Sequence, residues 1–294
     1  MQKIAVLAGI FALFSAYGAP LQLISHAGEQ YAAPGHSIPA YKIAIERKAD
    51  IMKLDLHMTK DGVLVLMHDP TTNKMMDKKF AIRRKTLQEL REQCTYKPKG
   101  GFEQEKIVRM EQALELLKDT PLQIWIDLKG HKLQGGILAQ KAMKLFKEYG
   151  IGNERLMTAS FNQSSLNFMR RHYPDVRRVL HVSISSTPDG KCILDSAPKG
   201  KNIFPPEEVV PHLLKKAEEL GLYGFNISIW KPVKKEWIQA LKAKGLWISF
   251  WFIQNKKAAA RALDFGGDAV VTDNLKEVEP FVREMEKKNA SNAN

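Results

Sequence analysis

The sequence predicts an α/β protein: a barrel of eight parallel strands and eight helices, with a small insertion after the second strand. Short runs rich in β-forming residues alternate with longer segments of helical period, the pattern of strands joined by crossover helices. The chain has 294 residues, and such a barrel needs about 250 as a single domain. Hydrophobic residues make up 44% of the chain, enough for a large core.

Each predicted strand is an apolar run bounded by polar or turn residues, and each predicted helix follows a strand. The strands are Leu21–His26, Ile51–His57, Gln123–Leu128, Arg155–Phe161, Arg178–Ile184, Phe225–Ile229, Trp247–Phe252 and Ala269–Asp273. The helices are Ser37–Arg47, Met110–Lys118, Gly136–Tyr149, Gln163–His172, Glu207–Leu220, Lys234–Lys244, Lys256–Phe265 and Lys276–Lys288. Ser37 is expected to cap the first helix, and Gly150, Gly221 and Gly245 to end later ones.

One further apolar run, Val63–His68, follows the second strand too closely for a parallel crossover. It is expected to turn back as the second arm of a hairpin, with Asp61 and Gly62 in the turn. The polar stretch that follows, about residues 70–109, is predicted to form a cap-like insertion with one short helix at Leu87–Gln93.

Residues 1–18 have the pattern of a secretory signal peptide. Lys3 gives a positive start, an apolar run follows, and small residues end at Gly18. The apolar run is shorter than the ~20 residues that span a bilayer, which disfavours an uncleaved anchor. We expect cleavage near Ala19 and a secreted or periplasmic protein, without stable membrane insertion, whose single barrel domain covers residues 19–294.

The chain is basic, with 45 Lys and Arg against 32 Asp and Glu and a formal net charge of +13. This surplus favours a small anionic ligand. Nucleic acid is not the expected partner, because the sequence has no zinc-finger spacing, RNA-binding aromatic signature or basic helix with a heptad repeat. Two cysteines, Cys94 and Cys192, cannot form a disulfide scaffold alone, and their pairing stays open, as does the oligomeric state.

Polar residues gather at the predicted C-terminal strand ends, where barrels of this kind place catalytic groups. His26 ends the first strand, and Asp127 lies near the end of the third. Lys53, Asp55 and His57 alternate along the second strand and so share one face. Polar groups that face a barrel interior need partners, either a ligand, a metal or one another.

His68 ends the hairpin arm and is expected to return to the same rim as His26, so that one histidine can take a proton and the other give one. Trp251 either packs in the core or forms a wall of the site, and Asp268 and Asp273 could equally cap helices. The other histidines are expected to be ordinary surface or core groups: His36, His131, His172, His181 and His212.

In several motifs the chain resembles the glycerophosphodiester phosphodiesterase family of phospholipase-C-like barrels. They are Ile24-Ser25-His26-Ala27-Gly28, the block from Leu54 to Pro70 with Thr59-Lys60-Asp61-Gly62 and His68-Asp69-Pro70, Ile126-Asp127-Leu128-Lys129, Ser160-Phe161, Trp251 and Thr272-Asp273. The resemblance implies an enzyme that hydrolyses glycerophosphodiesters to glycerol phosphate and an alcohol. It also implies that His26 and His68 are the acid-base pair, that Lys129 lies near the phosphate, and that Asp55 and Asp127 hold a divalent cation, Ca²⁺ or Mg²⁺.

Three positions depart from the family pattern: Ala27 replaces an arginine, Gly35 a glutamate and Lys53 a metal-ligating glutamate. A protonated lysine cannot ligate a cation, so a metal would rely on Asp55, Asp127 and either Glu29 or His57. Three carboxylates with one divalent ion carry the same formal charge as one ammonium with two carboxylates, so Lys53 could instead bind the substrate phosphate in place of the ion.

Two other functions remain open. A membrane-lipid phosphodiesterase of the sphingomyelinase type would need an apolar landing surface, which the basic segment Lys74–Lys85 does not favour. The departures at Lys53 and Ala27 also allow a catalytically weakened relative that only binds phosphodiesters. The leaving alcohol and the metal requirement are not determined by the sequence.

Overall fold

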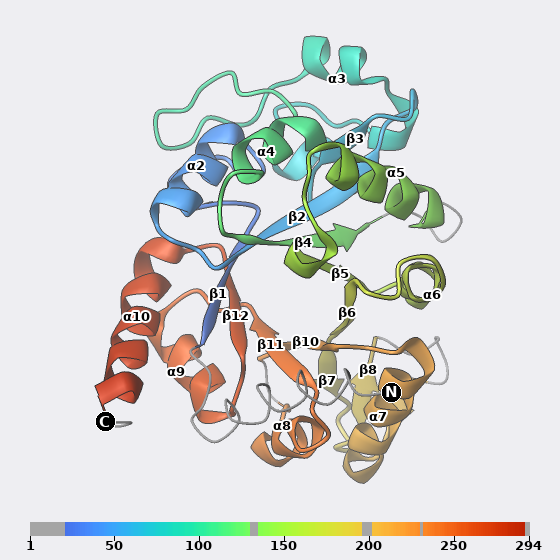
Figure 1. Ribbon diagram of the computed structural model, residues 1–294, viewed down its shortest axis with the longest axis vertical. Helices are drawn as coiled ribbons and strands as arrows, with labels where there is room; N and C mark the ends of the chain where they lie inside the picture. Colours follow the sequence, from blue (N-terminus) through green and yellow to red (C-terminus); the bar gives the residue numbers. More distant parts are fainter. Residues whose placement is uncertain (1–20, 130–134, 196–201, 230–231, 292–294) are drawn as a thin grey trace, which may run out of the picture.

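The computed structural model describes residues 21–129, 135–195, 202–229 and 232–291. Its centre is a closed barrel of eight parallel strands with helices around it (Figure 1), which confirms the predicted fold. The barrel strands, in the order in which they close the ring, are β1 (Gln22–His26), β2 (Ile51–Met58), β4 (Gln123–Leu128), β5 (Leu156–Ser160), β6 (Arg177–Val182), β10 (Gly224–Ser228), β11 (Trp247–Trp251) and β12 (Ala269–Thr272), which pairs with β1 again.

The helices that cover the barrel begin and end within three residues of their predicted limits. They are α2 (Ile38–Glu46), α4 (Met110–Leu117), α5 (Gly135–Glu148), α6 (Gln163–His172), α7 (Val209–Leu220), α8 (Lys235–Lys242), α9 (Lys256–Asp264) and α10 (Leu275–Ser291). The Ser37 hydroxyl accepts a hydrogen bond from the amide of Ala40 and so caps α2, as expected. Gly221 ends α7 in the left-handed conformation, which explains the glycine at that position.

The hairpin and the segment after it form a small unit beside the barrel. The strand β3 (Leu64–Leu66) pairs antiparallel with β2 and leads through two short 3₁₀ turns, Thr72–Lys74 and Ile82–Arg84, to α3 (Leu87–Gln93). A Thr86–Glu89 capping box starts α3. The unit has its own hydrophobic core, formed by Val65, Met67, Met76, Ile82, Leu90, Cys94, Tyr96 and Ile107.

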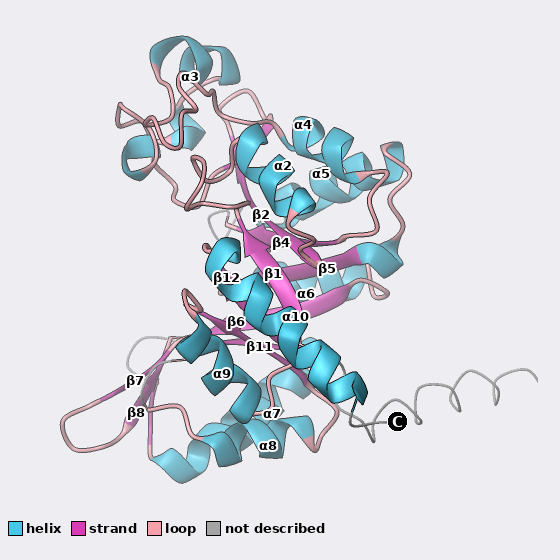
Figure 2. Ribbon diagram, turned by 90° about the vertical axis from the view of Figure 1, so that its left-hand side faces the viewer, coloured by secondary structure: helices cyan, strands magenta, loops and turns pink. Residues whose placement is uncertain are grey.

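A second excursion follows β6 and was missed by the sequence analysis. It is an antiparallel sheet of β7 (Ile184–Ser186), β8 (Cys192–Leu194) and β9 (Ile203–Phe204). Strands of two or three residues are too short to show an alternating pattern, which explains the omission. Figure 2 shows both excursions projecting from the same side of the barrel. Cys94 and Cys192 are buried in separate excursions and are unpaired.

The barrel interior changes from apolar to polar along the strands. An apolar layer fills its N-terminal part, formed by Ile24, Ile51, Trp125, Met157, Ala159, Val179, Trp247, Ala269 and Val271. Two residues further along their strands, the same faces carry His26, Lys53, Asp127 and His181. The apolar layer therefore forms a solid floor beneath a polar pocket at the C-terminal ends of the strands.

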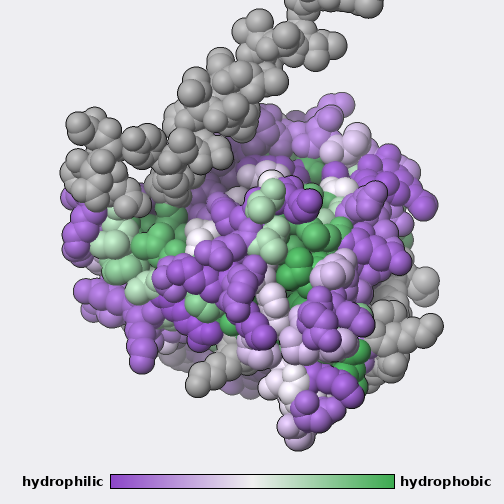
Figure 3. All heavy atoms as spheres, turned by 90° about the horizontal axis from the view of Figure 1, so that it is seen from below, coloured by the Kyte–Doolittle hydropathy of each residue, from purple (hydrophilic) through white to green (hydrophobic). Residues whose placement is uncertain are grey.

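The surface is largely polar where described residues appear in Figure 3, and the hydrophobic residues of that face gather in separate patches. No helix in the described ranges has both the length and the apolar character needed to cross a membrane.

Candidate active site

A cavity of about 280 Å³ opens at the C-terminal ends of the barrel strands. It brings together most of the residues that the sequence singled out, namely His26, Lys53, His68, Asp127, Lys129 and Trp251. Asp55 is completely buried directly behind this lining. The site residues come from β1, β2 and β11, from the end of β4 and the residue after it, and from the loop after β3, and the barrel brings these segments together.

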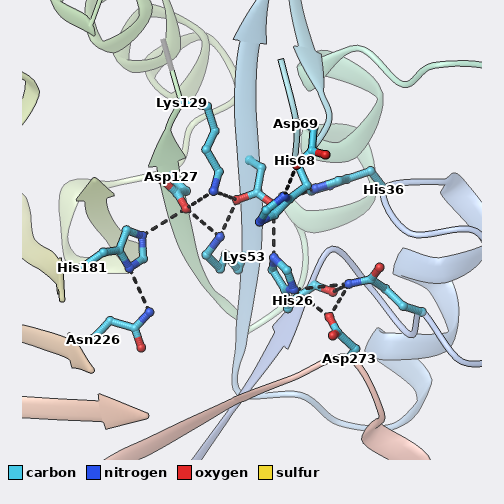
Figure 4. A network of polar contacts seen from close by, with 12 residues as sticks. His26, His36, Lys53, His68, Asp69, Asp127, Lys129, His181, Asn226 and Asp273 are labelled. Carbon is cyan, nitrogen blue, oxygen red and sulfur yellow. Dashed lines mark hydrogen bonds and ion pairs between the residues drawn. The ribbon is translucent and has the colours of Figure 1, made fainter. Parts of the chain in front are cut away.

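Two lysines and two aspartates form the centre of the site (Figure 4). In the sheet, Asp55 of β2 lies directly beside Asp127 of β4. The Nζ atom of Lys53 donates to Asp55 Oδ1 and, at 2.7 Å, to Asp127 Oδ2. Lys129 Nζ lies 2.9 Å from Asp127 Oδ2 and 3.4 Å from Asp55 Oδ1. Each carboxylate thus contacts both ammonium groups.

The surroundings hold Asp55, Asp127 and Lys129 in their charged forms. Burial alone would raise the pKa of Asp55 and Asp127, but the positive charges of Lys129 and Lys53 outweigh it and hold the pKa of both carboxyls well below the usual range. Burial would lower the pKa of Lys129, but Asp127 and Asp55 outweigh it and raise that pKa. Asp55, Asp127 and Lys129 are therefore charged at neutral pH.

Two buried histidines support the aspartates from behind. His36 Nε2 lies 2.9 Å from Asp55 Oδ2, and its Nδ1 lies 2.7 Å from the Tyr41 hydroxyl. His181 Nε2 lies 3.0 Å from Asp127 Oδ2. Burial lowers the pKa of His36 to about 4 and also lowers the pKa of His181, so both rings are neutral and donate one N–H to a carboxylate.

Both histidines were expected from the sequence to be ordinary surface or core groups. They are hydrogen-bonded as core histidines are, but their partners belong to the site. His181 follows Val179 by two residues on the inward face of β6, so the alternation rule that selected Lys53 and Asp55 could have selected it as well.

His26 and His68 face each other across the site, with ring centroids 5.3 Å apart. His26 Nδ1 is 2.6 Å from Asp273 Oδ1, and its Nε2 is 3.3 Å from Asp55 Oδ2. His68 Nδ1 is 2.8 Å from Asp69 Oδ1. Asp273, which follows β12, thus pairs with His26, and the side chain that accepts a hydrogen bond from the first turn of α10 is that of Asn274.

The surroundings move the pKa values of these two histidines in opposite directions. Burial and the charge of Lys53 oppose protonation of His26, but its hydrogen bonds to Asp273 and Asp55 outweigh them and raise its pKa above the usual value. Burial lowers the pKa of His68, and the charge of Lys129 adds to that effect against the attraction of Asp55. The pKa of His26 therefore lies above that of His68, so His26 is the more readily protonated of the two and His68 the more readily neutral, the difference that an acid-base pair uses.

Glu29 is not part of this cluster. The loop after β1 turns through Gly28 at a φ of +85°, where an added Cβ would lie 2.6 Å from the carbonyl carbon of Ala40. The Glu29 carboxylate then accepts hydrogen bonds from the amides of Tyr31, at 3.0 Å, and Lys276, at 3.2 Å. Its role here is to fasten the loop to the start of α10.

Aromatic side chains form one wall of the cavity. Trp251 lies with its ring centroid 6.4 Å from that of Phe161 and 4.9 Å from that of Phe252. Phe161 and Phe252 are 43% and 48% exposed, which is unusual for residues of this size. The site thus offers an apolar surface beside its charged centre.

The donor set does not fit a divalent cation. His26, Asp55 and His68 offer ligand atoms within 4.8 Å of one another. A carboxylate has about four lone-pair sites, and Asp55 already contacts Lys53, Lys129, His26 and His36. An ion between Asp55 and Asp127 would have to displace the ammonium group that bridges them.

The chain is similar in sequence and in fold to known phosphodiesterases. The chain is 28% identical over 264 residues to a glycerophosphodiester phosphodiesterase of Caldanaerobacter subterraneus, covering 89% of this chain and 97% of the relative. A phosphodiesterase of Oleispira antarctica, solved in complex with the product sn-glycerol-3-phosphate, superposes with a TM-score of 0.73 at 19% identity over 91% of this chain and 97% of that one. A glycerophosphodiester phosphodiesterase of Parabacteroides distasonis gives 0.68 at 20% identity over 94% and 100%.

The glycerophosphoryl diester phosphodiesterase family itself matches residues 26–277, from the first site histidine into α10. The match therefore covers every strand of the barrel except β1, of which it includes only the last residue, His26, and it includes the site residues from His26 to Asp273. The chain belongs to the glycerophosphoryl diester phosphodiesterase family.

Proposed function

We propose that the protein hydrolyses glycerophosphodiesters to glycerol phosphate and an alcohol, with His26 and His68 as the proton-transfer pair. The observation that carries the proposal is the opposite displacement of the pKa values of these facing histidines, at a cavity that also holds two lysines. Family membership supports the reaction class.

In the proposed reaction the phosphate lies beside Lys53 and Lys129, whose charges offset the negative charge that develops on its oxygens. Neutral His68 accepts a proton from the attacking water or from a neighbouring hydroxyl of the substrate. Protonated His26 donates a proton to the oxygen of the departing alcohol as the phosphorus–oxygen bond breaks. Asp273 holds the His26 ring and stabilises its charged form.

The test is a phosphorus NMR time course with glycerophosphocholine, intact phosphatidylcholine and sphingomyelin as separate substrates. We expect glycerol phosphate to appear from the first substrate only. Turnover of an intact lipid would mean that the substrate is a membrane lipid. Binding without turnover of any of the three would mean that the protein only binds phosphodiesters. Either result would overturn the proposal.

Trp251 is proposed to contact the substrate. Trp251→Ala should raise KM for the preferred glycerophosphodiester about five- to tenfold while kcat changes less, because an aromatic contact is typically worth about 1 kcal/mol. Steady-state kinetics measure both constants. Tyr223→Ala is the control, since Tyr223 is an aromatic residue that precedes β10 at the opposite end of the barrel. An unchanged KM in Trp251→Ala would remove this residue from the substrate site.

The protein is also proposed to be exported, with residues 1–18 as the signal peptide. That segment lies outside the described residues, and the support is its sequence pattern alone. Sequencing the N-terminus of the protein recovered from the periplasm or medium should give Ala19 or a residue close to it. Recovery of the chain only inside the cell, with residues 1–18 still attached, would contradict export.

A further inference from the structure

We propose that the Lys53 ammonium group takes the place of a divalent cation, so that this phosphodiester site works without a metal ion. The inference rests on the proposed function for its activity readout, but not for its binding readout. It concerns one residue that departs from the family pattern and the two carboxylates that it joins.

The position of Lys53 is that of a bridging cation. Its side chain is only 4% exposed, and its Nζ contacts a carboxylate oxygen of Asp55 and one of Asp127. An ammonium group has three donors, and the contacts described for Lys53 with these carboxylates account for two. Because Lys53 also lines the cavity, a phosphate oxygen there can accept the third.

The charge of the cluster is already balanced. Two ammonium groups offset two carboxylates, and each carboxylate contacts both ammonium groups. A divalent cation placed among them would add two positive charges at close range to Lys53 and Lys129, without an additional carboxylate to compensate. A glutamate at position 53 would reverse this balance, since its site would then hold three carboxylates and one lysine.

The carboxylates also accept from several donors already. Asp55 accepts from both lysines, His36 and, at longer range, His26. Asp127 Oδ2 accepts from both lysines and from His181. A metal ion would have to break several of these buried contacts, each of which leaves a donor unpaired.

An ammonium group in place of a metal ion changes which catalytic tasks the side chains must perform. An ammonium group offsets charge on phosphate oxygens but cannot acidify a bound water as a metal ion can. The proton of the attacking group must then go to a side chain, which fits a neutral His68 facing the cavity.

The first measurement uses the unaltered protein and Mn²⁺ as the probe. We expect electron paramagnetic resonance to show no stoichiometric Mn²⁺ binding and excess EDTA to leave the rate of glycerophosphodiester hydrolysis within about twofold. Binding of about one Mn²⁺ per chain, together with loss of turnover in EDTA and recovery with Mg²⁺ or Ca²⁺, would overturn the inference. No variant has to fold for this result to be decisive.

The second measurement uses three variants. Lys53→Glu should bind about one Mn²⁺, because it completes a three-carboxylate set with Asp55 and Asp127. Lys60→Glu makes the same charge change on the exposed hairpin turn and should bind none. Lys53→Met should lower kcat about 10²–10³-fold in EDTA, the usual effect of removing one charge-stabilising donor. Full activity of Lys53→Met in EDTA would contradict the role of the ammonium group.

A different experimental result would show that the proposed function is wrong. If no glycerophosphodiester is hydrolysed under any condition, the phosphodiesterase proposal falls. The contrast in Mn²⁺ binding between the unaltered protein, Lys53→Glu and Lys60→Glu still decides whether Lys53 occupies the place of a cation.

Discussion

His26→Ala and His68→Ala are each expected to lower kcat for a glycerophosphodiester about 10²–10⁴-fold, the usual cost of losing a general acid or base. The two rings face each other at the cavity and supply the only proposed route for the two proton transfers. Steady-state kinetics with phosphorus NMR detection would measure the loss. Circular dichroism melting should show little change for His68→Ala, because this side chain is 46% exposed and packs little.

His172→Ala is the control for these two variants, because His172 is exposed at the end of α6. It should retain the unaltered rate. If His26→Ala or His68→Ala also retained that rate, the corresponding residue would have no part in proton transfer.

The barrel was predictable because its signals are local. In the strands Gln123–Leu128 and Ile51–Met58, the residues are apolar except for polar residues that face the barrel interior. The helices between the strands have apolar residues at helical spacing and recognisable ends. The sheet β7 to β9 has no such signal, because its strands hold two or three residues each and are stabilised by one another.

The site was predictable only in part. The position of a residue at a strand end selected His26, Asp55, Asp127 and Lys129, since this architecture gathers strand ends at one rim. The partners of these groups depend on the strand register and on closure of the ring. The contact between His26 and Asp273 is an example, because it exists only where β12 pairs with β1, almost the full length of the chain apart.

Lys53 illustrates a second limit of prediction from the sequence. Its sequence position suggested either a lost metal ligand or a substitute for the ion, and residue type alone could not distinguish them. The register of β2 and β4 places Asp55 beside Asp127, and this neighbourhood determines what the ammonium group touches.

Asp273→Asn is expected to lower kcat about 10²–10⁴-fold, the range seen when a catalytic histidine loses the aspartate that orients it. It should also move the alkaline limb of the pH–rate profile to lower pH. The hydrogen bond to Asp273 raises the pKa of His26, so the neutral amide lowers that pKa. Since His26 acts in its protonated form, activity falls as pH rises through its pKa, and a lower pKa brings that fall earlier. The pH dependence of kcat/KM measures the limb.

Asp69→Asn separates this effect from a general change in charge. Asp69 lies 2.8 Å from His68, whose neutral form is needed and which therefore governs the acid limb. This variant should leave the alkaline limb in place. A purely structural role for Asp273 would lower the rate of Asp273→Asn without moving either limb. An unshifted alkaline limb would therefore show that Asp273 does not set the pKa of His26 during turnover.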